Sequence, residues 1–176
     1  MKHFSKTIVV AGTGRNVGKT TLACLLIEHY AKNQETIAIK ISPHLHYNIE
    51  EVKTRARIIA WTNDYVLMEE KKFVPNKDTT RMHNAGAKSV YFIMAKDNYL
   101  PEIIQIIKQE IDINSRIIFE SAAIINQIIP EKYIVVYNDE FPTLKEKYKH
   151  IPVDRFVYSK ENTFFVNKQV LSLNNF

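Results

Sequence analysis

Residues 7–21 of this 176-residue chain read TIVVAGTGRNVGKTT, and this stretch decides the fold. Its first part, Thr7–Ala11, consists of apolar and β-branched residues without alternation, which is typical of a strand buried on both faces. Gly12, Gly14 and Gly18 follow, so three of the four glycines in the chain lie within one short turn. Because glycine allows a positive φ and a close approach of the backbone to a ligand, we predict that this turn binds a ligand.

The turn joins the predicted strand to a predicted helix, Lys19–Lys32, and matches most of the phosphate-binding pattern G-x-x-x-x-G-K-[ST]. Thr13 replaces the first glycine of the pattern, and Gly12 comes one residue earlier. In such a loop, backbone N–H groups and the helix N-terminus point at phosphate oxygens. We expect the Lys19 ammonium to bridge the β- and γ-phosphates and the Thr20 hydroxyl to bind Mg²⁺. The residues predicted to hold the nucleotide are Thr13, Gly14, Arg15, Asn16, Val17, Gly18, Lys19, Thr20 and Thr21.

Two other interpretations of the glycine turn stay open. It is also compatible with a plain surface turn that carries a solvated lysine. The Gly12-x-Gly14 pair resembles the start of a dinucleotide-binding fingerprint, but Val17 occupies the third glycine position. In addition, the second predicted strand leads into Lys40, where that fingerprint has an acidic residue.

Strand-like and helix-like segments alternate along the rest of the chain. A helix that Pro101 opens has isoleucines at helical spacing, and a shorter one is predicted from Pro142. This alternation predicts an α/β fold of the P-loop NTPase three-layer type, with a mostly parallel central sheet and one domain spanning residues 1–176. The further predicted strands are Thr36–Ile41, Val90–Ala95, Arg116–Phe119 and Tyr133–Tyr137.

The segment Ser42–Lys77 is the least regular part of the sequence. Glu50–Trp61 is predicted to be a helix, because acidic residues come first and arginines later. Tyr65–Met68 and Lys71–Val74 are predicted to pair as a small hairpin. A segment of this length between core strands usually carries function or a partner surface.

Composition narrows the cellular setting and the partners. The single cysteine, Cys24, excludes an internal disulfide and fits a reducing cytoplasm. No apolar run approaches the length of a membrane span, and we expect no membrane contact. The net charge of +5 suits anionic ligands such as nucleotides. The lysines are scattered, which argues against a dedicated nucleic-acid-binding protein.

Four segments in order resemble known families. The loop Thr13–Thr20, with Gly12 ahead of it, looks like the loop of dethiobiotin synthetase. Ile39–His46, Pro75–Ala87 and Ile117–Ser121 are similar to three segments of the molybdopterin-guanine dinucleotide biosynthesis protein B (MobB) family: Lys-His-x-His, Lys-Asp-Ser through Ala-Gly-Ala, and a strand ending in Glu-Gly. The resemblance covers about residues 6–137, and it departs from the family at Pro43-His44 and at Ser121, which replaces the glycine after the acidic residue.

The resemblance to MobB implies a parallel-sheet P-loop fold that binds Mg²⁺ with ATP or GTP, slow hydrolysis and a homodimer. MobB proteins assist the attachment of a nucleotide to molybdopterin, so the implied partner protein is a nucleotidyltransferase. The resemblance to dethiobiotin synthetase implies instead an ATP-dependent ligase or kinase that acts on a small acid. A third interpretation is a nucleotide-gated partner switch with Ser42–Lys77 as the moving surface.

Three further side chains are candidates for the chemistry, in addition to Lys19. Glu120 ends a predicted strand, where P-loop proteins hold a carboxylate near Mg²⁺ or the attacking water; the other interpretation is a solvated strand end. Asp78 is either another metal-binding carboxylate or the N-cap of a helix over Thr79–Ala85. Lys40 is either a surface lysine or, as its equivalent in the family implies, a contact for the γ-phosphate or an anionic substrate. The predicted catalytic residues are therefore Lys19, Lys40 and Glu120, and the predicted metal ligands are Thr20, Asp78 and Glu120.

Three features of the sequence bear on the rest of the site. His44 and His46 are expected to be exposed loop histidines. Arg15 is expected either to stabilise transferring charge or to point into solvent. Asn76-Lys77-Asp78 resembles a guanine-binding motif but is one residue too short, whereas Asn138-Asp139 follows a late strand and is the better-placed candidate for the base edge.

Overall fold

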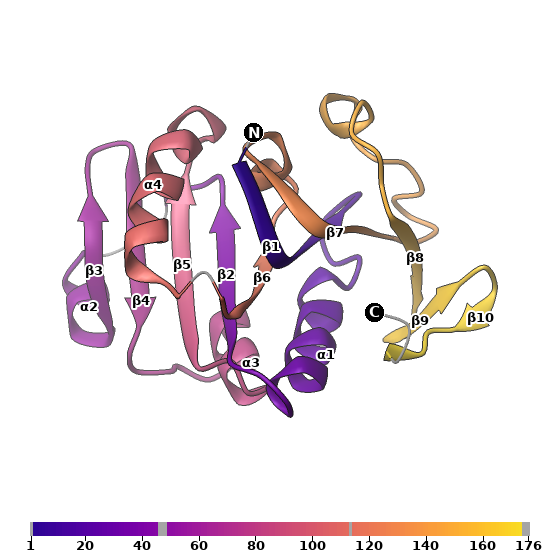
Figure 1. Cartoon of the computed structure of the whole chain (residues 1–176), viewed down its shortest axis with the longest axis horizontal. Coiled ribbons are helices and arrows are strands. Elements are labelled where there is room, and N and C mark those ends of the chain that lie inside the picture. Colours follow the sequence, from indigo (N-terminus) through magenta and orange to yellow (C-terminus); the bar gives the residue numbers. More distant parts are fainter. Residues whose placement is uncertain (1, 46–48, 113, 174–176) are drawn as a thin grey trace.

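The computed structural model of the chain describes residues 2–45, 49–112 and 114–173 (Figure 1). Its ten strands form one sheet in the order β10-β9-β8-β7-β1-β6-β2-β5-β4-β3. The six strands from β8 to β5 are mutually parallel, and antiparallel strands extend both edges of the sheet. The chain is therefore an α/β protein with a mostly parallel, mixed sheet.

The strands and helices have the following bounds. The strands are β1 (Lys2–Gly12), β2 (Thr36–Ser42), β3 (Ala56–Trp61), β4 (Tyr65–Glu70), β5 (Ser89–Ala95), β6 (Arg116–Glu120), β7 (Ile128–Tyr137), β8 (Arg155–Lys160), β9 (Thr163–Val166) and β10 (Gln169–Val170). The helices are α1 (Lys19–Ala31), α2 (Ile49–Arg55), α3 (Asp78–Asn84) and α4 (Leu100–Glu110), and short 3₁₀ turns are η1 (Asp97–Tyr99), η2 (Ala123–Asn126) and η3 (Glu146–Tyr148).

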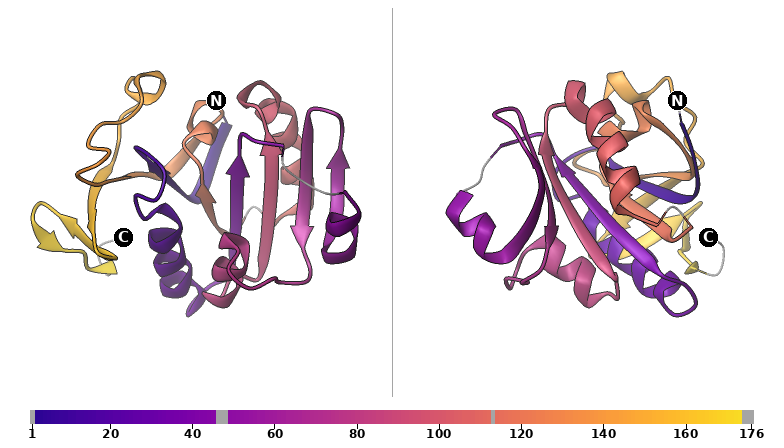
Figure 2. Two further views of the ribbon diagram at one scale, coloured as in Figure 1. Left: turned by 180° about the vertical axis from the view of Figure 1, so that it is seen from behind. Right: turned by 60° about the vertical axis from the view of Figure 1, so that its left-hand side comes forward.

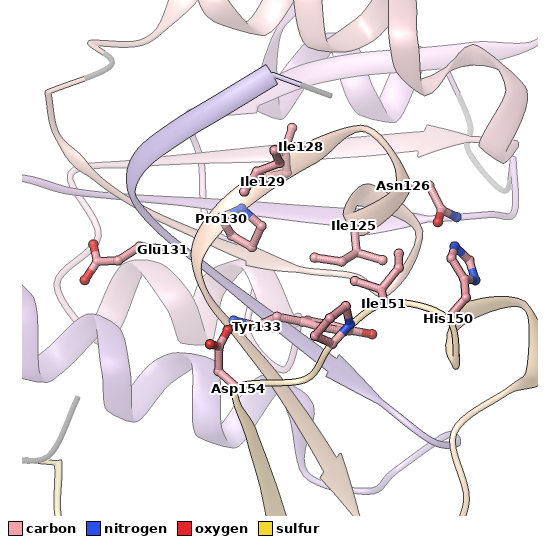
Figure 3. Close-up of a pocket in the computed structure, with 11 residues that line it drawn as sticks. Ile125, Asn126, Ile128, Ile129, Pro130, Glu131, Tyr133, His150, Ile151 and Asp154 are labelled. Atoms are coloured by element: carbon pink, nitrogen blue, oxygen red, sulfur yellow. Dashed lines mark hydrogen bonds between the residues drawn. The ribbon is translucent and has the colours of Figure 1, made fainter.

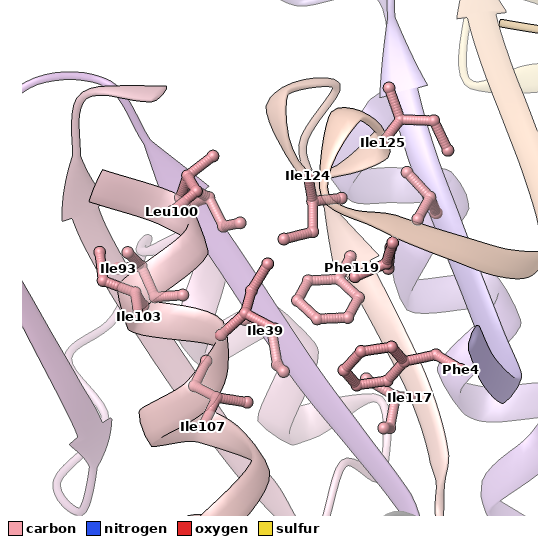
Figure 4. Packing of buried hydrophobic residues seen from close by; sticks show 14 of the residues in the cluster. Phe4, Ile39, Ile93, Leu100, Ile103, Ile107, Ile117, Phe119, Ile124 and Ile125 are labelled. Carbon is pink, nitrogen blue, oxygen red and sulfur yellow. The ribbon is translucent and has the colours of Figure 1, made fainter. Parts of the chain in front are cut away.

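Helices cover both faces of the parallel strands, which gives three layers (Figure 2). On one face, Leu22 and Leu26 of α1 and Met82 of α3 pack against strand residues such as Ile8. On the other face, α4 presents its apolar stripe to the sheet, and η2 packs beside it (Figure 4). Leu100, Ile103, Ile104 and Ile107 recur at helical spacing on that stripe, so one side of α4 is buried.

The connections between strands place a crevice beside β1. From β1 the chain passes through α1 to β2, which lies on one side, whereas from β6 it passes through η2 to β7, which lies on the other. The strands β1 and β6 are adjacent and parallel, and their outgoing connections leave in opposite directions, toward β2 and toward β7. Ligands of open α/β sheets bind at such a switch point, at the carboxyl ends of the strands.

The structure confirms the five predicted core strands, the α/β class and the helices that begin at Lys19 and near Pro101. Thr7–Ala11 proves to be the second half of a longer strand, β1, in which Lys6 has φ 59° and the pairing with β7 shifts register. The predicted helix from Pro142 is wrong, because the only helical turn there is the 3₁₀ turn η3.

The predictions for Ser42–Lys77 need correction in two places. The helix expected over Glu50–Trp61 ends at Arg55, and the remainder is strand β3. The expected hairpin of Tyr65–Met68 with Lys71–Val74 does not form, since β4 pairs with β3 and β5 instead. Every residue of β4 is buried, so much of this segment belongs to the sheet itself. Movement of this segment on nucleotide binding stays a prediction.

Ile117 on β6 gives a test of the central packing. Its side chain is fully buried, and Ile117→Ala is expected to lower the free energy of unfolding by about 2–5 kcal/mol, because it leaves a cavity. Ile129→Ala on β7, where the side chain is 43% exposed, is the matched control and should cost less than about 1 kcal/mol. Urea unfolding measures both, and equal losses would contradict the position of Ile117 in the core.

Candidate functional site

The glycine turn between β1 and α1 is shaped by the side chain of Lys19. A Cβ atom on Gly12 would lie 2.6 Å from Cγ of Lys19, so the lysine stem passes directly over this glycine. Thr13 points away from the turn, where its Oγ1 donates to the carbonyl oxygen of Phe141 at 2.6 Å. Gly12, which comes one residue before the first glycine position of the pattern, is therefore the residue that the Lys19 side chain crosses. The Thr13 side chain does not occupy the turn.

The rest of the turn is fixed by packing and by unusual backbone angles. Gly18 has φ 96° and Asn16 has φ 54°, which are left-handed conformations that glycine and asparagine tolerate best. Gly14 lies against the ring of Phe141, and a Cβ atom there would be 2.3 Å from the ring. Val17 is fully buried in the core beneath α1 and anchors the turn.

Lys19 turns its ammonium group into the turn. Its Nζ donates to the carbonyl oxygen of Gly14 at 2.6 Å. Desolvation lowers the pKa of Lys19 below its ordinary value; the charge of Glu120 opposes this shift, and that of Lys40 adds to it. Burial therefore makes the charged form of Lys19 less favourable than it is in water.

Glu120 is the centre of a polar cluster at the ends of β6 and β2. Its side chain is 4% exposed, and both carboxylate oxygens accept from the Thr20 hydroxyl, at 3.0 and 2.9 Å. The Lys40 ammonium donates to Glu120 at 3.0 Å and to Asp78 at 2.6 Å. The registers explain this meeting, because Val10 of β1 and Lys40 of β2 both pair with Glu120.

Two carboxylates hold Lys40 in its charged form. Its pKa is raised: desolvation acts downward, but the charge of Glu120 and the hydrogen bond to Asp78 outweigh it. Asp78 is not the N-cap of α3, since Lys77 holds that position and Asp78 is the first residue of the helix. Of the two interpretations of Asp78, the structure favours a part in the charged cluster.

Two cavities open on this cluster and share part of their lining. One, of about 400 Å³, runs along the outer side of the turn and the start of α1. The other, of about 530 Å³, lies over the ends of β2, β5 and β6. Arg15, Lys19, Lys40 and Glu120 line both cavities. Arg15 is exposed at the mouth of both, so the structure does not separate its two interpretations.

Several residues at the site were not expected from the sequence. Arg81 on α3 donates to the Thr21 hydroxyl at 2.9 Å and lines the smaller cavity. Asn162 from the β8–β9 turn also lines this cavity. Arg81 lies three residues after Asp78 on the same helix, and helical spacing was the available signal. The sequence contained no comparable signal for Phe141 or Asn162, because tertiary packing brings them beside a turn that lies more than a hundred residues earlier.

The remaining candidates have other surroundings. His44 is exposed at the edge of the larger cavity, and His46 lies outside the described residues. Asn138 accepts from the backbone N–H of Phe141 at 2.9 Å, and Asp139 accepts from the Tyr158 hydroxyl at 2.7 Å. The polar atoms expected to read the base edge thus hold the loop after β7.

A further cavity, of about 540 Å³, lies between η2, the start of β7 and the segment before β8 (Figure 3). Its lining is mostly apolar and includes Ile125, Ile128 and Pro130. Asp154 at its edge accepts from the backbone N–H of Tyr133 at 2.7 Å. This cavity contains none of the residues predicted for the site, so we place the candidate site at the glycine turn.

The oxygen donors of the cluster suit a hard cation. The Thr20 hydroxyl and the Glu120 carboxylate are adjacent, and Mg²⁺ prefers one or two such ligands together with phosphate oxygens and water. Within the described ranges, no group of three or more His, Cys, Asp and Glu side chains could hold a metal ion by itself. Mg²⁺ here would therefore need further oxygen ligands, such as water or phosphate.

The comparisons with known proteins find no match. A scan against protein-family models, a search of curated proteins and a search of solved structures are all negative. Among the described residues, no helix combines the length and the apolar character that a membrane span requires. The geometry of the chain itself therefore has to carry any functional proposal.

The contact between Gly14 and Phe141 gives a test of how the turn is held. Gly14→Ala is expected to lower the free energy of unfolding by about 1–3 kcal/mol, since the new methyl group meets the ring. In a Phe141→Ala background the same substitution should cost less than about 0.5 kcal/mol. Thermal or urea unfolding of the four proteins measures the coupling, and an equal cost in both backgrounds would exclude the contact.

Proposed function

We propose that the chain binds Mg²⁺ with ATP or GTP, with the phosphates at the turn between β1 and α1. The observation that carries the proposal is the position of the Lys19 ammonium, which lies inside a glycine turn at a helix N-terminus, 2.6 Å from a backbone carbonyl oxygen. Backbone N–H groups, helix dipole and ammonium group then act on one small volume, as phosphate binding requires. Thr20 and Glu120 supply oxygens for Mg²⁺ at the same place.

The cluster also supports slow hydrolysis of the nucleotide. The Lys40 ammonium lies where it can offset charge on a terminal phosphate, and Glu120 is close enough to orient a metal ion or a water molecule. The three segments that resemble MobB contribute Lys40, Asp78 and Glu120, and Lys40 contacts both of the carboxylates. This meeting supports a MobB-like accessory role in molybdenum cofactor nucleotide attachment, with a homodimer and a nucleotidyltransferase partner as parts of the same proposal.

Lys19→Ala tests the proposal directly. We expect it to weaken Mg-ATP or Mg-GTP binding by roughly 100-fold, because a charge-assisted contact to phosphate is lost. Lys32→Ala is the matched control, since Lys32 is an exposed lysine at the other end of the same helix. Calorimetry with and without EDTA measures affinity and the Mg²⁺ requirement, and circular dichroism checks folding. Unchanged affinity in Lys19→Ala, or no nucleotide binding by the wild-type chain, would refute the proposal.

A second candidate function is transfer of the γ-phosphoryl group to a small carboxylic acid. The larger cavity favours it, because Arg15, Lys40 and Lys145 make its lining cationic and it adjoins the cluster. In that reaction a carboxylate oxygen attacks the γ-phosphorus, the bond to the β–γ bridging oxygen breaks, and an acyl phosphate and a nucleoside diphosphate form. The carboxylate would lie in the larger cavity and the nucleotide in the smaller one.

Lys145→Ala separates the two candidate functions. Release of nucleoside diphosphate is expected to rise when small mono- and dicarboxylic acids are added. Lys145→Ala should raise the KM for the acid about tenfold without changing nucleotide affinity. Lys149→Ala is the control, because Lys149 is exposed on the same segment and pairs with Glu146. A coupled assay for the nucleoside diphosphate measures turnover. If no acid in the panel raises turnover, the second candidate is abandoned.

A further inference from the structure

The smaller cavity extends beyond the phosphate turn toward the C-terminal strands. The strand order places β6 and β2 on one side of β1 and β7 and β8 on the other. Lys40, Asp78 and Glu120 line the cavity on the first side, and Asn162 lines it on the second. Since neighbouring strands are about 4.8 Å apart, β8 is roughly 10 Å from β1 across the sheet. A cavity of this extent has room for more than a triphosphate.

Charge gives the cavity a direction. The Lys40 ammonium group and the oxygens of Glu120 and Asp78 are on the β2 and β6 side, where the proposed terminal phosphate and Mg²⁺ would find their partners. The turn itself, with Gly18 at the start of α1, lies between the two sides. The nucleoside end of the ligand is then directed toward β8 and the turn that follows it.

Asn162 is held firmly at that end. Lys160 pairs with Thr163, so Glu161 and Asn162 form a two-residue hairpin turn, with φ 48° and 63°. The hairpin packs on the start of α1: a Cβ atom on Gly18 would be 2.8 Å from Oγ of Ser159 and 3.1 Å from the Phe164 ring. Phe164 is 4% exposed in the core that contains α1, and Figure 1 shows the hairpin beside this helix.

We propose that Asn162 binds the nucleobase of the triphosphate, an inference that rests on the proposed function. An asparagine amide offers both a donor and an acceptor, so it pairs with the edge of a base. The Asn162 side chain is exposed into the cavity and makes no hydrogen bond within the part of the chain that the structure describes. It is thus available to a ligand, unlike the acceptor oxygens of Asn138 and Asp139, which have partners in the chain.

Turn geometry alone also favours asparagine at this position, and the chain contains an internal comparison. Asn167 and Lys168 form a second two-residue turn between β9 and β10, with φ 51° and 66°. Asn167 lines none of the three cavities described above. Glycine adopts the backbone of either turn without strain, so Asn→Gly removes the amide and keeps the hairpin. The two asparagines differ in position relative to the cavity.

The test compares nucleotides with inorganic tripolyphosphate as ligands, each with Mg²⁺. Asn162→Gly is expected to weaken ATP or GTP binding about three- to tenfold, because one hydrogen bond to the base is lost. Binding of tripolyphosphate should change less than about twofold. Asn167→Gly should change neither affinity. Calorimetry measures all three proteins, and thermal unfolding checks that both variants remain folded.

The outcomes separate this inference from the proposed function. If Asn162→Gly binds nucleotides as the wild-type chain does, or loses nucleotide and tripolyphosphate affinity equally, Asn162 does not contact the base. If the wild-type chain binds neither ligand, the phosphate site itself is refuted. Nucleotide affinity that falls equally in Asn162→Gly and Asn167→Gly would assign the effect to the hairpins and also overturn the inference.

Discussion

A buried carboxylate at the end of β6 is the constraint on which the site depends. Glu120 is almost inaccessible to solvent, and an ionised group in such surroundings must be paired or hydrogen-bonded. Lys40 from β2 supplies the charge, and Thr20 from α1 supplies the hydroxyl. Three elements that are distant in the sequence are thus joined at one point, and their relative positions follow from satisfying one negative charge.

The same carboxylate links the cluster to the charge at Lys19. Its oxygens accept from Thr20 and Lys40, and Lys40 also binds Asp78. Lys19, nearby, is stabilised in its charged form only in part, because desolvation lowers its pKa. A bound polyanion would add negative charge next to both ammonium groups, and a divalent cation would offset the carboxylates. The cluster thus joins Glu120, Lys40, Thr20 and Asp78 by hydrogen bonds, and Lys19 lies beside it with a lowered pKa.

The sequence predicted the elements that are locally encoded and missed those that depend on distant contacts. Apolar runs and helical spacing identified the core strands, α1 and α4, because burial on one or both faces determines those patterns. The strand β3 was mistaken for helix, since its first residues continue the charge pattern of α2. Of the site, residues in the glycine turn were predictable from spacing, as were strand-end residues such as Glu120. Phe141 was not, because its part at Gly14 arises from tertiary packing.

The C-terminal strands and the loop before them support the glycine turn. The loop after β7 meets Gly14 through Phe141, and the β8–β9 hairpin meets Gly18 through Ser159 and Phe164. Both glycines are therefore enclosed by segments that come more than a hundred residues later. A turn enclosed in this way has little freedom to rearrange, which is the kind of preorganisation that ligand sites generally need. The late strands thus shape the candidate site in two ways: their side chains pack against the glycine turn, and Asn162 lines the smaller cavity.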